Sequence, residues 1–282
     1  MFRHLLCSLA FLSVGCTITI QTPEVNPDFL SKVSNSESLD TPKRTANSTE
    51  ETISLAGVTD IRIAAPLKVT VKEDAAAEAI LKVPAEIRER LQIQTQGRGF
   101  ALTVKDDFCI QSEASGFGSN STVIINGTVR TDCFTTDTEL SLEISSTLLE
   151  ELTLSHAVEV TLNNLDEADF VLRTLGASSV EFRNMRDIED LRIDISGASS
   201  ISATGNTPVL DSLQIETSGA SKVDLANVLA KQVTVDISGV SQVSVQSEQP
   251  VSGRVTGVSS LTLSGNPNHR VQTSGVSHVG YR

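Results

Sequence analysis

The sequence predicts an all-β protein built as a parallel β-helix, and three observations support this fold class. A short motif, Ser-Gly-Ala/Val-Ser with close variants, recurs along the second half of the chain at spacings of 20, 21, 22, 20, 18 and 18 residues. Apolar and polar residues alternate on both sides of each motif, which indicates strands with one buried face. The chain is 39% hydrophobic and 4% aromatic, enough apolar material for a core but not for a membrane-embedded bundle.

Each repeat centres on a glycine, which we expect at a corner between two short strands, because a residue without Cβ turns the chain most freely. His156 takes this place in a worn first copy. A hairpin meander would also alternate, but it would not need the same corner in the same direction at every second turn. A solenoid of stacked laps does need the same corner in every lap, so we expect about seven laps of 18–22 residues. The repeat-corner glycines are Gly176, Gly197, Gly219, Gly239, Gly257 and Gly275.

Two further positions of the motif repeat in every lap. The Ala or Val after the glycine is small enough to stack just inside the bend, and we expect it there. The serine that follows is interpreted as one rung of a hydroxyl ladder and not as a nucleophile, because it recurs lap after lap without a recognisable catalytic elbow. These residues are Ala198, Ala220, Val240, Val258 and Val276, and Ser199, Ser221, Ser241, Ser259 and Ser277.

The first residues predict export and lipid anchoring. Residues 1–15 combine a basic start with a short apolar run, which is typical of a signal peptide and too short to span a bilayer, since that needs about 20 residues. Gly15-Cys16 resembles a bacterial lipobox, in which Cys16 is lipidated. The residue after the cysteine is Thr17 and not Asp, and in this the sequence resembles Gram-negative lipoproteins that are sorted to the outer membrane. Ordinary secretion without lipidation is the alternative.

Residues 16–50 are expected to form a disordered tether after the lipidated cysteine, because they are rich in Ser, Thr, Asn, Glu and Pro and lack an apolar period. The folded domain is then expected over residues 51–282. A short helix is expected at Ala85–Leu91, "AEIRERL".

Residues 107–138 are predicted to be an insertion closed by a disulfide between Cys109 and Cys133. Two cysteines in an exported domain most simply pair, and such a bridge contributes about 3 to 4 kcal/mol. Asn126-Gly127 between β-branched runs indicates a tight hairpin turn inside this insertion. A zinc site is the competing interpretation, but no further Cys or His lies nearby in the sequence.

The repeated corners also carry a family resemblance. Together with "STLLEELTLS" at Ser146–Ser155 and "ISLAGVTDIRIAAPLKVTVKE" at Ile53–Glu73, they resemble the head GIN domain of putative auto-transporter adhesins. The resemblance covers roughly residues 52–106 and 139–282; the cysteine insertion is not a regular part of the pattern. It implies a right-handed, pectin-lyase-like β-helix in bacterial surface or periplasmic lipoproteins, with a role in adhesion and no catalytic residues.

One column of charged residues invites chemistry. Three residues before successive corner glycines lie Asp194, Glu216 and Asp236, with Arg173 and Arg254 at the ends. Carboxylates stacked about 4.8 Å apart could collect a calcium ion. A solvated ladder neutralised at its ends is the alternative, and a lyase is less expected because no Lys or Arg occupies the middle of the column as a base. No other cofactor is expected.

The charge balance limits the partners. With 22 Lys and Arg against 35 Asp and Glu, the net charge of −13 would repel a nucleic acid. The sequence therefore favours a non-catalytic, lipid-anchored cell-envelope protein that binds a surface protein or polymer. The alternatives are an envelope scaffold without an external ligand and a polysaccharide-acting enzyme. The chain has no Trp and one Tyr, which argues against the enzyme because sugar-binding subsites commonly use aromatic side chains. The last lap lacks a polar cap, so we expect docking or homo-oligomerisation through the end of the β-helix.

Overall fold

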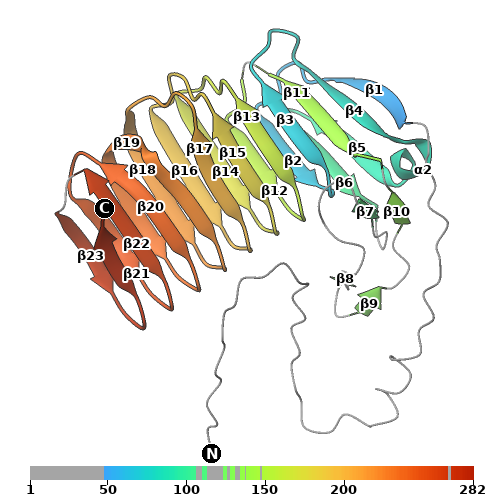
Figure 1. Ribbon diagram of the computed structural model, residues 1–282. Helices are drawn as coiled ribbons and strands as arrows, with labels where there is room; N and C mark the ends of the chain where they lie inside the picture. The colour runs from blue at the N-terminus through green and yellow to red at the C-terminus, as the bar shows by residue number, and fades with distance from the viewer. Residues whose placement is uncertain are drawn as a thin grey trace, which may run out of the picture.

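The computed structural model of the chain describes residues 48–105, 110–112, 123–125, 128–130, 134–136, 138–146, 148–265 and 268–282. Of the described residues, 62% are in strands and 2% in a helix, and the strands stack as a parallel β-solenoid of about six turns (Figure 1). The predicted fold class is confirmed, with about six turns where about seven laps were expected. No helix among the described residues is long and apolar enough to cross a membrane.

Each lap contributes one strand before the corner, here called an upstream strand, and one after it, a downstream strand. The upstream strands are β12 (Glu151–Leu154), β14 (Asp169–Thr174), β16 (Asp190–Ile195), β18 (Leu210–Thr217), β21 (Val251–Val255) and β23 (His269–Thr273). The downstream strands are β13 (Glu159–Asn163), β15 (Ser179–Arg183), β17 (Ser200–Thr204), β20 (Gln242–Ser247), β22 (Ser260–Gly265) and β24 (His278–Tyr281). The 16-residue β19 (Lys222–Ile237) is downstream strand of one lap and upstream strand of the next.

The core lies between upstream and downstream strands and is built of aliphatic columns. In β16, Leu191, Ile193 and Ile195 are 2%, 0% and 3% exposed, while the residues between them face outward. Leu191 and Ile193 stack in register on Leu213 and Ile215 of β18. Each such side chain, when fully buried, contributes about 1.5 to 3 kcal/mol. The alternation seen in the sequence therefore fixes both the faces and the register of the laps.

The N-terminal end of the solenoid is closed by antiparallel strands. The first described laps are β2 (Asp60–Ala64) with β3 (Lys68–Lys72), and β6 (Gly99–Val104) with β11 (Ser141–Ser145), which pair in parallel. Beyond them β5 (Leu91–Gln96), β4 (Glu78–Pro84) and β1 (Ser48–Ser54) pair antiparallel, next to the short helix α2 (Ala85–Arg88) (Figure 1). The predicted helix is present but ends at Arg88, and Leu91, expected to be its last residue, begins β5. β1 begins three residues before the expected domain start at residue 51.

The described residues of the insertion form two small strand pairs. β7 (Ile110–Ser112) pairs in parallel with β10 (Phe134–Thr136), and β8 (Val123–Ile125) pairs antiparallel with β9 (Thr128–Arg130) on either side of the expected hairpin turn. Asn126, Gly127, Cys109 and Cys133 lie outside the described residues, as do residues 1–47 with Cys16. The disulfide, the signal peptide, the tether and the lipidation site therefore stay predictions.

The orientation expected for the residue after each corner glycine is wrong. Val240, Val258 and Val276 are 60%, 57% and 77% exposed and point outward, and Ala198 and Ala220 are also exposed. The serine one position later is buried instead, with Ser199 at 3% and Ser221 at 5%. The reason is that the in-and-out alternation of the strand continues through the corner, so the position after the glycine faces solvent and the next one faces the core.

The corner glycines are required mainly by close packing between laps, and not by the freedom to turn that the sequence predicted. A Cβ on Gly219 would lie 1.8 Å from the carbonyl oxygen of Gly197 in the preceding lap, and Gly219 has no positive φ. Only the later corners, such as Gly239 with φ 84°, also adopt the left-handed conformation that favours glycine. The close approach of stacked laps, and not the freedom to turn, is what all six corners share.

Candidate functional site

The outward side chains of the upstream strands form one continuous polar surface, here called the charged face. The predicted column lies on it in register: Arg173 is opposite Asp194, Asp194 opposite Glu216, Glu216 opposite Asp236 and Asp236 opposite Arg254. Thr153 of β12 extends the column beyond Arg173. Because strand pairing is parallel and without shifts here, spacing in the sequence translates directly into adjacency on this face.

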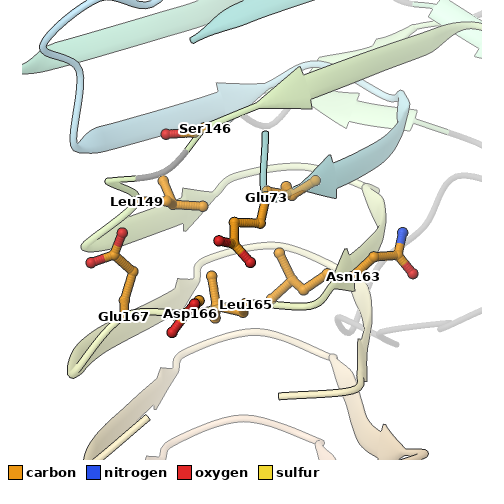
Figure 2. A pocket seen from close by; sticks show the side chains of 9 residues that line it. Glu73, Ser146, Leu149, Asn163, Leu165, Asp166 and Glu167 are labelled. Carbon is orange, nitrogen blue, oxygen red and sulfur yellow. The ribbon is translucent and has the colours of Figure 1, made fainter. Parts of the chain in front are cut away.

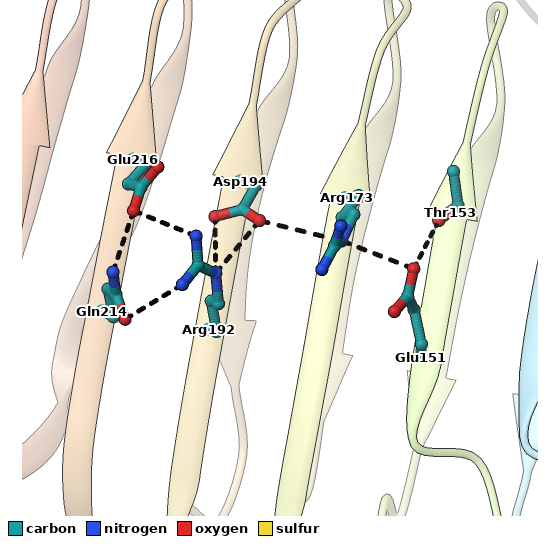
Figure 3. Close-up of polar contacts among 7 residues, drawn as sticks. All are labelled: Glu151, Thr153, Arg173, Arg192, Asp194, Gln214 and Glu216. Carbon is teal, nitrogen blue, oxygen red and sulfur yellow. Dashed lines mark hydrogen bonds and ion pairs between the residues drawn. The ribbon is translucent and has the colours of Figure 1, made fainter.

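Arg192, which was not among the predicted site residues, organises this face. Its Nε lies 3.0 and 3.1 Å from the two carboxylate oxygens of Asp194, and its Nη2 lies 3.0 Å from Oε1 of Glu216 (Figure 3). Nη1 donates to Oε1 of Gln214 at 3.4 Å. The hydrogen bond to Asp194 is the largest cause that raises the pKa of Arg192. A signal was available, since a residue two positions before Asp194 shares its face.

The ends of the column are paired as well. Arg173 Nε lies 3.4 Å from Oε1 of Glu151 and 3.7 Å from Oδ2 of Asp194. Arg254 Nη2 donates to Oδ2 of Asp236 at 2.7 Å. Each carboxylate of the predicted column thus has a guanidinium partner, and the three stacked acids are part of a network of ion pairs.

Two shallow grooves lie along the charged face. One, of about 370 Å³, is lined by Arg173, Asp194, Glu216 and Asp236 together with the half-exposed Leu175. The other, also about 370 Å³, is lined by Arg62, Gln94, Gln96, Glu151 and Thr153. Thr153 pairs with Arg62 on one side and with Arg173 on the other, so the grooves are neighbours on the same surface. The geometry is that of an extended contact surface.

The structure gives no ready cation site at the column. Among the residues that it describes, no group of three or more His, Cys, Asp and Glu side chains is arranged to hold a metal ion. The guanidinium groups of Arg192 and Arg254 occupy the carboxylates that calcium would need. Calcium binding by Asp194, Glu216 and Asp236 stays a prediction.

A separate acidic cavity lies near the N-terminal laps. Glu73, Asp166 and Glu167 surround a space of about 10 Å³, which is room for about one water molecule (Figure 2). Burial is the largest cause that raises the pKa of Glu167, and the nearby charges of Glu150, Asp166 and Glu73 add to it. Arg186 lies 3.7 Å from Glu73. The cavity is too small for a substrate.

The comparisons with known proteins agree with this architecture. The sequence profile of the family described as "Putative auto-transporter adhesin, head GIN domain" matches residues 57–267. No curated protein sequence matches the chain.

Solved structures share the fold at low identity. A putative adhesin from Bacteroides fragilis is similar with a TM-score of 0.67 and 13% identity, covering 83% of this chain and 97% of its own. A putative lipid binding protein from Parabacteroides distasonis has a TM-score of 0.63 and 12% identity, covering 84% and 98%. A putative adhesin from Parabacteroides merdae has a TM-score of 0.59 and 13% identity, covering 85% and 98%.

Proposed function

Because the chain belongs to the family described as "Putative auto-transporter adhesin, head GIN domain", we propose that it is a non-catalytic adhesion module of the bacterial cell envelope. Its binding surface is the charged face. The observation that carries this proposal is the pair of neighbouring shallow grooves on one continuous surface of paired charges. An extended, open surface suits a macromolecular partner, whereas a small substrate is usually enclosed in a deeper pocket.

The paired charges of this surface favour specific binding over high affinity. Arg192 already has Asp194, Glu216 and Gln214 as partners, so a ligand must exchange these bonds for its own. Each exchange contributes little, and a useful affinity needs many of them along the laps. The partner that fits is a long polar chain, such as an extended surface protein or polymer, lying across several upstream strands.

We also propose that Cys16 carries a lipid and that the protein is anchored in the outer membrane. The lipobox resemblance and the family support this. The test is metabolic labelling of the expressed chain with a radioactive fatty acid, followed by membrane fractionation. The label should be lost, and the protein released from the membrane fraction, in Cys16→Ser. Label retained in Cys16→Ser would overturn the assignment.

Adhesion is tested with the chain from residue 16 onward carrying Cys16→Ser, labelled and added to intact bacterial and host-type cells with and without calcium. We expect saturable binding that falls several-fold in Arg192→Ala. The matched control is Lys222→Ala on β19, an exposed cation of a downstream strand. Calcium-dependent binding would point to Asp194, Glu216 and Asp236. Absence of binding to either cell type under both conditions would favour an internal envelope scaffold.

A further inference from the structure

The two ends of the solenoid differ. The N-terminal end is covered by β1, β4, β5 and α2, whereas the last strands, β23 and β24, pair only with β21 and β22 in the described part of the chain (Figure 1). Ser274 donates its backbone N–H to the carbonyl of Val255 in the preceding lap at 3.0 Å. Alternate residues of a strand direct their backbone groups to opposite sides, so Val271 and Thr273 direct theirs to the outer edge of β23. The N–H of Val271 donates there to Nδ1 of His269 at 3.2 Å, which leaves the carbonyl of Val271 and both backbone groups of Thr273 for a further strand.

The core is thinly covered at this end. Leu261 and Leu263 of β22 are 0% and 1% exposed, but the residues stacked on them, Val279 and Tyr281, are partly buried and 54% exposed. The rings of His269 and Tyr281 contact each other across the end at 6.1 Å between centroids. These two rings cover part of the end, and His269 also accepts the backbone N–H of Val271.

This end also carries the opposite charge to the laps next to it. Residues 249–282 contain three Arg and no Asp or Glu, whereas residues 139–248 contain six Lys and Arg against eighteen Asp and Glu. Arg254 is paired with Asp236, but Arg270 and Arg282 are exposed in the last lap. The open strand edge therefore lies at a cationic pole of an acidic protein, and a field of this kind attracts anionic partners.

We propose that the C-terminal end of the solenoid is a docking site for an extended acidic segment of another polypeptide, which adds as a strand to the outer edge of β23. The carbonyl of Val271 and the backbone groups of Thr273 supply the pairing, and the exposed arginines select the charge. A second copy of this chain fits less well, because a tail-to-tail pair would bring two copies of Arg270 and Arg282 together at the junction. The side chain of Arg270 lies at the C-terminal end of the charged face, in register with Ser252, but the backbone edge of β23 is a different surface from the two grooves of that face.

The test uses a fluorescent twelve-residue peptide of alternating Thr and Glu, titrated with the chain from residue 16 carrying Cys16→Ser, and fluorescence anisotropy. We expect saturable binding that weakens with salt and falls about fivefold in Arg270→Glu, as expected for reversing one exposed interface charge. Lys222→Glu is the matched control and should bind like the unsubstituted chain. A peptide with two central prolines should not bind, because proline cannot donate to the ladder.

Three results would overturn the proposal. The first is no saturable binding at millimolar peptide. The second is that the protein binds the proline peptide as tightly as the Thr-Glu peptide, or that the Arg270→Glu variant binds the Thr-Glu peptide as tightly as the unsubstituted chain does. Equal melting temperatures would show that the variant is folded. The third is that another occupant takes this edge. Sedimentation could show a concentration-dependent dimer that no longer binds the peptide, or the protein could bind anionic vesicles through Arg270 and not bind the peptide. Either would assign the edge to a different occupant.

Discussion

The hydroxyl of Ser199 donates to the backbone carbonyl of Gly176, one lap earlier, at 3.2 Å. The same carbonyl accepts the backbone N–H of Ala198 at 3.0 Å. Equivalent pairs recur at the following corners, for example between Ser221 and Gly197 and between Ser241 and Gly219. The repeated motif is thus a device for joining laps: the glycine allows the close approach, and the serine takes the second lone pair of the glycine carbonyl below it.

Replacing Gly219 with alanine should strongly destabilise the protein. The added Cβ would lie 1.8 Å from the carbonyl oxygen of Gly197, which belongs to the backbone of the preceding lap. We expect a loss of about 3 kcal/mol or more in the free energy of unfolding, measured by urea denaturation. The control is Ala220→Val, since later laps carry Val at this exposed position; it should change stability by less than about 0.5 kcal/mol. Equal effects of the two changes would contradict the stacking of the corners.

Removing the hydroxyl of Ser221 should have a smaller, defined effect. Ser221 is 5% exposed and donates to the carbonyl of Gly197 at 3.1 Å. Ser221→Ala should lower the free energy of unfolding by about 1 kcal/mol, which is typical for one buried hydrogen bond. Ser200→Ala, at an exposed position of β17, is the comparison and should be near neutral. A neutral Ser221→Ala would show that the ladder contributes nothing measurable.

Arg192→Ala should expose the carboxylates of the charged face to cations. Without the guanidinium, Asp194 and Glu216 lose their shared partner. We expect calcium to bind more tightly to Arg192→Ala than to the unsubstituted chain in isothermal titration calorimetry, because the competing charge is gone. Lys222→Ala, away from this face, should leave calcium binding unchanged. Identical calcium binding by the Arg192 variant and the unsubstituted chain would mean that Arg192 does not compete with calcium for the carboxylates of the column.

Glu167 should make stability fall as the pH rises. Its pKa is raised in the folded protein, first by burial and then by nearby acids, so the folded state binds its proton more tightly than the unfolded state does. Stability is therefore lost from about the ordinary glutamate pKa of 4.3 up to the raised value, and it stays lower above that. Glu167→Gln should raise the melting temperature at pH 7 but not at pH 3. Glu159→Gln, at an exposed position, should show no such difference.

The sequence predicted what depends on repetition and missed what depends on contact between different parts of the chain. The spacing of the corner glycines and the register of Asp194 with Glu216 followed from counting, because parallel laps stack without shifts. The role of Arg192 was missed because only one column of the face was considered. β1 and β4 cover the N-terminal end, but no repeated sequence motif predicts this. Glu73 and Glu167 line the same cavity although they are far apart in the chain, so their proximity could not be predicted from spacing.

The in-register stacking of the laps makes the length of this protein an evolutionary variable. Each lap bonds only to its neighbours, and its core positions hold the same kinds of aliphatic residue as the laps on either side, as Leu191 and Leu213 show. Duplication or deletion of one unit of 18–22 residues would leave the remaining contacts unchanged. Natural selection can therefore lengthen or shorten the reach of the rod in whole steps while the two differently built ends, and whatever they hold, stay as they are.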